Sequence, residues 1–205
     1  LLKAGEIALK GLNRSTFEDR LVKNCKFRLR DIGSFRFTRA QSTMYAEPLS
    51  EDIDMDDAVE TLQHVFGFSK LSRACVVEKD MDTICAAAEE YLGRELRKIR
   101  TFKVEAKRSD KKFPLKSPEI AAEVGGYLLS RFSNLRVDVH EPDLVIFVEI
   151  RDQAAYIHGP QLDGAGGMPV GSSGKAMLLV SGGIDSPVAG YMMAKRGLEI
   201  EAIHF

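Results

Sequence analysis

The chain has 205 residues, of which 44% are hydrophobic and 29% are charged, with a formal net charge of −1. This composition is typical of a soluble globular protein with one large or two small domains, each with its own core. No apolar run approaches the roughly 18 residues of a membrane helix, and no signal peptide is visible, so we expect a cytoplasmic protein without a membrane partner. The chain opens on Leu1 rather than Met, which suggests that a few residues precede it.

The three cysteines are Cys25, Cys75 and Cys85. Their number is odd, their spacing is wide, and they form no CxxC pair. We therefore expect neither a disulfide framework nor a zinc site, but small buried thiols in a reducing compartment.

Charge is strongly segregated along the chain. Residues 1–45 contain ten Lys or Arg against four Asp or Glu, whereas residues 46–66 contain seven acids and no Lys or Arg. Residues 94–116 again contain ten basic residues against three acids. Any one such run is typical of a solvated helix face, but two basic stretches in a nearly neutral protein indicate a polyanionic partner.

The first 77 residues predict a ferredoxin-like βαββαβ unit. Residues 1–9 form the first strand, and Ser15 with Glu18 forms a capping box that starts a helix ending before Gly33. That helix has an apolar stripe with a four-residue repeat, namely Phe17, Leu21, Cys25 and Leu29. Residues 35–39 and 43–47 form a hairpin around residues 40–42. A second helix starts at Asp54 or Asp56 and is stopped by Gly67, and residues 71–77 form the last strand.

Residues 78–160 predict a second α/β unit. A helix over residues 81–97, with Asp82 as its N-cap, precedes an alternating strand over residues 101–107 and a basic loop over residues 108–116. Ser117 and Pro118 start a helix whose apolar residues are Ile120, Val124, Leu128 and Phe132. Gly125 and Gly126 in its middle suggest close approach by a neighbouring backbone. Three strands follow, over residues 135–139, 144–150 and 154–158.

A linker over residues 161–174 leads to a βαβ unit. An apolar strand ends at Val180, Ser186 and Pro187 cap and start a helix, Gly197 stops it, and residues 199–205 form a second strand. The intervening loop lies at a helix N-terminus, where backbone N–H groups and the helix dipole favour an anion. It is not a Walker A loop, because Ala176 follows Lys175 where Ser or Thr should stand. Residues 164–167 fail as a dinucleotide fingerprint because Pro169 replaces the third glycine.

The loop sequence Ser181-Gly182-Gly183-Ile184-Asp185-Ser186 resembles the SGGxDS loop of the PP-loop ATP pyrophosphatases, which cleave ATP between the α- and β-phosphates. The alternative is an ordinary glycine turn in a βαβ unit. Residues 107–114 resemble the basic loop of a THUMP domain, an RNA-binding module. Residues 3–14 resemble the N-terminal signature of the bacterial tRNA 4-thiouridine synthetases (tRNA sulfurtransferases), and the order of three modules resembles that family over essentially the whole chain.

This resemblance implies a mixed α/β and α+β fold: a ferredoxin-like domain (1–77), a THUMP domain (78–160), a linker (161–174) and the first βαβ of a doubly wound PP-loop domain (175–205). It implies that ATP with Mg²⁺ lies against Leu179, Val180, Ser181, Gly182, Gly183, Asp185, Ser186, His204 and Phe205. Asp185 is the catalytic candidate, holding magnesium or only pinning the loop. Phe205 as a plain core residue is the competing interpretation.

The resemblance implies that tRNA binds through the THUMP and N-terminal domains. The candidate residues for phosphate and 2′-OH contacts are Lys107, Arg108, Lys111, Lys112, Phe113 and Lys116. Phe113 stacks on a base or packs under the following helix. His140 and His158 have no evident catalytic partner.

In the family, ATP adenylates a uridine of tRNA (position 8), pyrophosphate leaves, and a persulfide sulfur displaces AMP. A cysteine desulfurase, a sulfur-carrier protein, a homodimer and a role in thiamine biosynthesis are further implications. None of the three cysteines matches the sulfur acceptor, which is expected beyond Phe205, and about 30 residues form only the start of a PP-loop domain. We therefore expect a truncated, inactive part of the enzyme. The alternatives are a non-catalytic RNA-binding fragment, or a PP-loop amide ligase for a small molecule, against which the first 160 residues argue.

Overall fold

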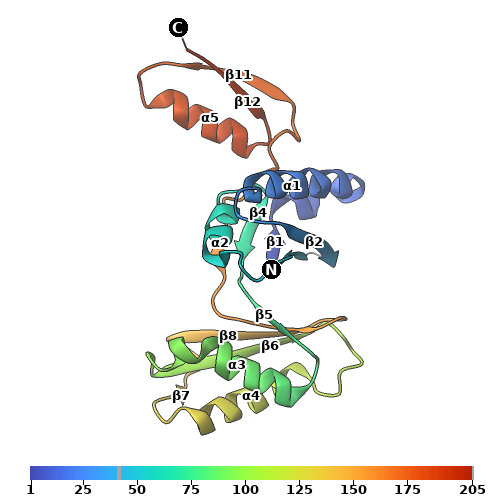
Figure 1. Cartoon of the computed structure of the whole chain (residues 1–205), viewed down its shortest axis with the longest axis vertical. Coiled ribbons are helices and arrows are strands. Elements are labelled where there is room, and N and C mark those ends of the chain that lie inside the picture. Colours follow the sequence, from blue (N-terminus) through green and yellow to red (C-terminus); the bar gives the residue numbers. More distant parts are fainter. Residues whose placement is uncertain (41–42, 205) are drawn as a thin grey trace. The chain divides into compact units, whose positions relative to one another are not determined.

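The computed structural model describes residues 1–40 and 43–204. The chain divides into two compact units, one formed by residues 1–71 with 161–205 and the other by residues 72–160 (Figure 1). The second unit is thus inserted between two segments of the first. No helix in the described part of the chain is long and apolar enough to cross a membrane.

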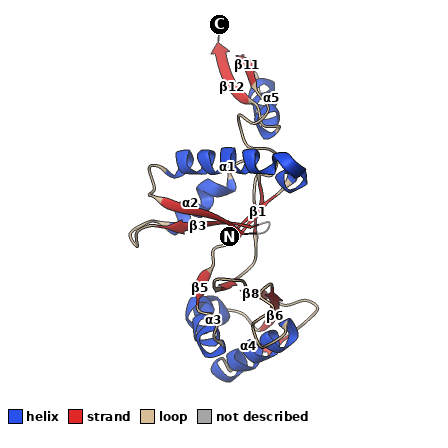
Figure 2. Ribbon diagram, turned by 90° about the vertical axis from the view of Figure 1, so that its right-hand side faces the viewer, coloured by secondary structure: helices blue, strands red, loops and turns tan. Residues whose placement is uncertain are grey.

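The first unit contains a five-stranded sheet in the order β10-β4-β1-β3-β2, with all neighbours antiparallel. The strands are β1 (Leu2–Ala4), β2 (Phe35–Ala40), β3 (Thr43–Pro48), β4 (Phe68–Leu71) and β10 (Leu162–Asp163). Helices α1 (Arg14–Leu29) and α2 (Met55–Gln63) pack against this sheet through a shared apolar core (Figure 2). The central order β4-β1-β3-β2 is the predicted ferredoxin-like arrangement.

The N-terminal strand is much shorter than residues 1–9. Two 3₁₀ turns, η1 (Glu6–Leu9) and η2 (Gly11–Asn13), follow β1, and the side chain of Ile7 is fully buried in the core. The predicted capping box is also wrong, because α1 begins at Arg14 and Asn13 makes no side-chain cap bond. The Glu18 carboxylate is instead occupied by Arg14, whose Nε lies 2.6 Å from Oε1, and by Arg39.

Asp54 is the N-cap of α2, since its carboxylate accepts hydrogen bonds from the N–H groups of Asp56 and Asp57 at 2.9 and 3.2 Å. The strand predicted over residues 71–77 is wrong as a single element. It is two short strands, and β5 (Cys75–Val77) pairs with β9 in the sheet of the second unit. The ferredoxin-like sheet gains β10, from the predicted linker, as its edge strand beside β4.

The second unit has a five-stranded sheet in the order β5-β9-β8-β6-β7. Its other elements are α3 (Met81–Leu96), β6 (Thr101–Arg108), α4 (Ser117–Arg131), β7 (Arg136–Val137), β8 (Leu144–Ile150) and β9 (Ala155–His158). The predicted stripe of α4, from Ile120 to Phe132, is buried against β6, β8 and α3. Asp80 rather than Asp82 caps α3, by accepting a hydrogen bond from the N–H of Thr83.

The two glycines in the middle of α4 do not admit a neighbouring backbone. A Cβ at Gly125 would meet only a methyl group of Val104 at 3.9 Å, and one at Gly126 would meet nothing within 4 Å. The prediction of close backbone approach at this point is therefore wrong.

Residues 161–174, which we call the connecting segment, are fastened to the first unit. The N–H groups of Gly164, Ala165 and Gly166 donate hydrogen bonds of 2.8 to 3.0 Å to carbonyls of β4 and of the end of α2. The side chain of Met168 is buried in the ferredoxin-like core, and its N–H donates to the carbonyl of Lys195 at 2.9 Å. The predicted linker is thus part of the folded unit.

The βαβ unit comprises β11 (Lys175–Val180), α5 (Asp185–Lys195) and β12 (Glu199–His204), with β11 and β12 parallel. Gly197 has a φ of 92°, and its N–H donates to the carbonyl of Ala194 while that of Leu198 donates to Met193. These two bonds form a Schellman motif, as expected from a glycine at C′.

We predict that Gly167→Ala destabilises the first unit. Gly167 has a φ of 72°, and an added Cβ would lie 2.3 Å from the carbonyl oxygen of Lys195. Backbone strain and steric conflict together should lower the free energy of unfolding by at least about 2 kcal/mol. Urea unfolding, monitored by hydrogen exchange at the amides of β4 and α4, would report the free energy of unfolding of each unit separately.

Gly126→Ala is the matched control, because the added methyl enters open space on an exposed helix position. It should stabilise the second unit by about 0.5–1 kcal/mol. If Gly167→Ala left the free energy of unfolding of the first unit unchanged, the connecting segment would not be what holds the βαβ unit in place.

Candidate functional site

The segment of residues 181–186, which we call the phosphate loop after its predicted ligand, joins β11 to α5 at the carboxyl end of the parallel strand pair. Residues 181–185 are exposed to solvent. A Cβ at Gly182 would meet nothing within 4 Å, and one at Gly183 only the Ser181 hydroxyl at 3.6 Å. The backbone N–H groups of this loop are therefore open to a ligand as large as a phosphate.

The internal hydrogen bonds of the loop are long. The N–H of Gly183 donates to Ser181 Oγ at 3.4 Å, and the N–H of Ser181 donates to Ser186 Oγ at 3.4 Å. Ser186 Oγ in turn donates to the carbonyl of Gly183 at 3.5 Å. All three exceed the usual 2.7–3.2 Å range, so these groups can exchange weak internal bonds for stronger bonds to an anion.

Ser186 is not the N-cap that its sequence position predicts. Helix α5 begins one residue earlier, at Asp185, and the N-cap Ile184 makes no side-chain cap bond. The Ser186 hydroxyl turns back to the loop instead. This places the hydroxyl among the loop atoms, where it can contact a ligand.

Asp185 stands in the first turn of α5 with an exposed side chain. Within residues 1–40 and 43–204 it makes no ion pair, and no group of three or more potential metal-ligating side chains occurs there. A single carboxylate beside a phosphate loop fits Mg²⁺ that takes its other ligands from substrate phosphates and water. Asp185 is therefore the residue that would hold such an ion.

The remaining predicted nucleotide contacts lie at the ends of the two strands. Leu179 is exposed and Val180 is half-buried, and His204 Nδ1 lies 2.9 Å from the carbonyl oxygen of Val180. This contact joins the ends of β11 and β12. Phe205 lies outside the described residues.

The basic loop of the second unit is organised around Asp110. Lys79 Nζ lies 2.7 Å from Asp110 Oδ2, and the N–H of Lys112 donates to Oδ1 at 2.9 Å. Both hydrogen bonds lower the pKa of Asp110, and the bond from Lys79 contributes most. Lys79 also donates to the carbonyl of Asp152 at 2.6 Å, and so ties the loop to the turn after β8. The role of Lys79 was missed from the sequence, where it lies 31 residues before Asp110.

Two of the predicted RNA contacts have structural roles. Of the two interpretations of Phe113, the structure has the packing one, because its ring is only 6% exposed and lies in the core of the second unit. Arg108 Nη1 donates to the carbonyl of Phe113 at 3.0 Å, which holds the loop closed. The exposed side chains of the set are Lys107, Lys111, Lys112 and Lys116.

None of the cysteines belongs to the βαβ unit that carries the phosphate loop. Burial raises the pKa of Cys25 to about 12, and burial, with a smaller contribution from Glu123, raises that of Cys85 to about 11. The pKa of Cys75 is also raised, first by burial and then by Glu90. These thiols are poor nucleophiles near neutral pH, consistent with packing roles.

His158 is buried beside Phe147, with ring centroids 5.0 Å apart, and its Nδ1 lies 2.7 Å from the carbonyl oxygen of Gly159. His140 is exposed, and its N–H donates to the carboxylate of Asp138. His158 Nε2 lies 3.7 Å from Glu149 Oε1, and Glu149 also pairs with Arg151, so His158 belongs to a buried polar cluster of the second unit.

Three protein-family models match successive parts of the chain. They are the ThiI ferredoxin-like domain over residues 1–72, the THUMP domain over residues 78–158, and the thiamine biosynthesis protein (ThiI) over residues 171–205. This chain belongs to the ThiI family. The predicted ferredoxin-like and THUMP folds are thereby confirmed.

A probable tRNA sulfurtransferase from Acetivibrio thermocellus is 47% identical to this ThiI-family chain, over all of the chain and 53% of the relative. A crystal structure of a 4-thiouridine synthetase–RNA complex with bound ATP matches with a TM-score of 0.86 at 36% identity, over 100% of this chain and 51% of that one. A Pyrococcus horikoshii protein, PH1313, matches with a TM-score of 0.85 at 30% identity, over 99% and 66%. The chain spans about half the length of the curated relatives it matches.

We predict that Cys25 resists alkylation in the folded protein. At a pH of 9.0, the ordinary pKa of the thiol, a pKa of about 12 leaves a thiolate fraction of roughly 10⁻³. Because the folded state keeps its proton longer than the unfolded state, the stability contributed by the neutral thiol is lost as pH rises from 9.0 towards about 12. Iodoacetamide labelling with peptide mass analysis measures the rate.

Cys75, which is partly exposed, is the internal reference and should label faster than Cys25. Labelling of Cys25 at the rate of the urea-unfolded chain would contradict its assignment as a packed core residue.

Proposed function

We propose that this chain acts in the ATP-dependent thiolation of a uridine in tRNA. The observation that carries the proposal is the open SGGxDS loop at the end of a parallel strand pair, in the same chain as a THUMP domain with exposed lysines. The names of the relatives support the same activity. A small-molecule ligase would have no use for the THUMP unit.

In this proposal the N–H groups of residues 181–183 and the hydroxyls of Ser181 and Ser186 hold the phosphates of ATP. Asp185 holds Mg²⁺, which neutralises phosphate charge when bound. Leu179, Val180 and His204, together with Phe205, line the nucleotide at the carboxyl ends of the strands. The side chains at the loop leave the approach to the phosphates open, as in-line attack by a uridine oxygen requires.

The exposed lysines of the basic loop contact phosphate and 2′-OH groups of an RNA stem. They fix the position of the RNA without reading its sequence. Arg108 and Phe113 maintain the loop conformation that presents those lysines. Removing either would act on RNA binding indirectly.

The proposed reaction begins with attack of the uridine O4 (position 8 by family resemblance) on the α-phosphorus, with pyrophosphate as the leaving group. A persulfide on a cysteine outside this chain then attacks C4 of the uridine, the C4–O bond breaks and AMP leaves. A second thiol outside this chain breaks the S–S bond, which releases the thiolated uridine and leaves a disulfide. A cysteine desulfurase, with or without a sulfur-carrier protein, would supply that sulfur, and a homodimer would be the working form. The buried positions of Cys25 and Cys85 support an acceptor elsewhere.

We predict that Asp185→Asn in the full-length protein lowers tRNA-dependent pyrophosphate release by at least about 10²-fold, because the amide cannot hold Mg²⁺ against the phosphates. A coupled pyrophosphate assay with and without tRNA measures the rate. Glu201→Gln, an exposed carboxylate on β12, is the matched control and should retain activity. Pyrophosphate release that does not depend on tRNA would favour a small-molecule ligase. If the wild-type protein released no pyrophosphate with or without tRNA, a non-catalytic RNA-binding protein would be favoured.

We predict that Lys111→Ala with Lys112→Ala reduces the dependence of tRNA affinity on salt. Each lost phosphate contact should lower the slope of log K against log salt by about 0.9, hence by about 1.8 for the pair. Filter binding over a range of salt concentrations measures the slope. Lys98→Ala with Arg100→Ala, two exposed cations before the opposite end of β6, is the control. An unchanged slope in the loop variant would remove the loop from the interface.

A further inference from the structure

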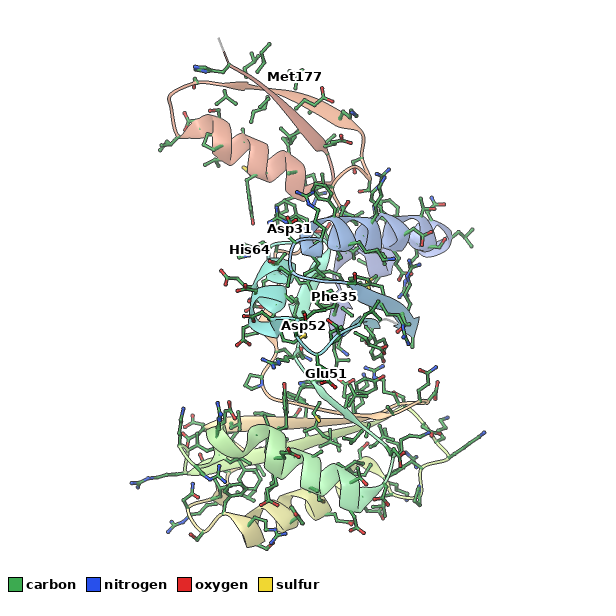
Figure 3. The ribbon with its side chains drawn as sticks, viewed as in Figure 1. Asp31, Phe35, Glu51, Asp52, His64 and Met177 are labelled. Carbon is green, nitrogen blue, oxygen red and sulfur yellow. The ribbon has the colours of Figure 1, made fainter. Side chains whose placement is uncertain are left out.

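A groove of about 470 Å³ runs along the outer side of α1 in the first unit. Its walls come from α1 and from the residues that follow α2, beginning at His64 (Figure 3), with Val170 of the connecting segment. The volume lies in the range of about 300–1,000 Å³ that is usual for sites of small molecules. Neither the phosphate loop nor the basic loop contributes to it.

The cations of this groove are not neutralised. Arg20, Lys23 and Arg28 line it, and none of them pairs with a carboxylate in residues 1–40 and 43–204. Elsewhere on the first unit, Arg14 and Arg39 are paired with acidic residues of α1. The one carboxylate among the lining residues, Glu199, lies 3.4 Å from Lys175, a cation that it shares with Glu201.

An aromatic ring is exposed among these cations. Phe27 is 63% exposed, and the Arg30 guanidinium lies 4.2 Å from its ring centroid. That cation–π contact restricts the ring, and the side chain still lines the groove. Val65 and Phe66 add apolar surface. An exposed aromatic ring beside unpaired cations is the combination with which proteins bind single-stranded nucleic acid.

The walls of the groove are held before any ligand binds. Asn24 Nδ2 donates a hydrogen bond to the carbonyl of Val170 at 3.1 Å, which fixes α1 to the connecting segment. Phe66 makes an edge-to-face contact with Tyr191 of α5, with centroids 5.1 Å apart. A ligand here would therefore pay little ordering entropy in the protein.

We propose that this groove binds a single-stranded segment of RNA, with a base stacked on Phe27 and phosphates beside Arg20, Lys23 and Arg28. The nine residues from Arg20 to Arg28 span about 12 Å of helix, so the three cations can contact successive phosphates of one strand. An acidic peptide fits less well, because its carboxylates offer no planar base to stack on the exposed ring of Phe27. The inference rests on the proposed RNA substrate and adds a second contact, separate from the basic loop.

The test compares two labelled RNA hairpins, one blunt-ended and one with a single-stranded tail of about ten nucleotides. Binding of each to the whole chain is measured by fluorescence anisotropy. Phe27→Ala should weaken binding of the tailed hairpin roughly tenfold and leave the blunt one unchanged, and Phe27→Tyr should bind like the wild type. Arg20→Gln with Lys23→Gln should lower the salt slope for the tailed hairpin by about 1.4 relative to the wild type.

Lys26→Gln, an exposed cation of α1 outside the groove, is the control and should not affect the preference for the tail. Unchanged affinity of Phe27→Ala for the tailed hairpin would overturn the inference. The inference would also be overturned if polyglutamate displaced the tailed hairpin and its own binding required Phe27. That result would assign the groove to an acidic protein. If the wild type binds neither hairpin, the proposed function fails as well. If Lys111→Ala with Lys112→Ala weakens binding but Phe27→Ala does not, only this inference fails.

Discussion

The backbone bonds between the connecting segment and the end of α2 with β4 are the constraint on which the phosphate loop depends. The chain leaves the first unit after Leu71 and returns at residue 161, and closing such a long excursion costs entropy that local sequence cannot offset. Four main-chain hydrogen bonds between residues 164–166 and 63–69, and the burial of Met168, offset that cost. Because Met168 also bonds to Lys195, the same contacts fix the far end of α5 and hence the helix that carries Asp185.

The phosphate loop itself is held only weakly, and this contrast has a chemical use. Its internal bonds are 3.4 to 3.5 Å long, whereas the connecting segment that anchors the βαβ unit has bonds near 2.8 to 3.0 Å. A loop whose N–H groups make only long hydrogen bonds, on a firmly anchored βαβ unit, binds an anion without first breaking strong protein bonds. The basic loop follows the same plan, because Asp110, Arg108 and Phe113 fix the backbone while the lysines stay in solvent.

Features set by neighbours in sequence were predictable. The four-residue stripes of α1 and α4, the N-cap at Asp54 and the Schellman glycine at 197 depend on one or two helical turns, and the structure has them. Predictions failed where a distant residue competes. Glu18 pairs with Arg14 and with the distant Arg39 rather than capping α1, and Phe113 packs in a core formed by α4 and the sheet.

The candidate site shows the same division between local and distant control. The loop from Ser181 to Ser186 was predictable from six consecutive residues, although the shift of the helix start to Asp185 was not. The unpaired state of the α1 cations could not be recognised from the sequence, because Asp19 stands four residues before Lys23 but pairs with Arg39, 20 residues along the chain. The apolar wall opposite them comes from residues 65–66 and 170, which no local pattern connects to α1.

The pairing of β4 with β10 has a consequence for modularity. Leu71 and Leu162 face each other across one sheet, and Cys75 and Ile157 face each other across the other. In each unit, the two points where the chain leaves and returns are therefore paired neighbours in a sheet. This is the geometry in which the insertion of one domain into another is tolerated. The THUMP unit can thus be excised and replaced by a tight turn without breaking the host sheet, and its own two ends, held together by β5 and β9, allow it to be transplanted whole into another host.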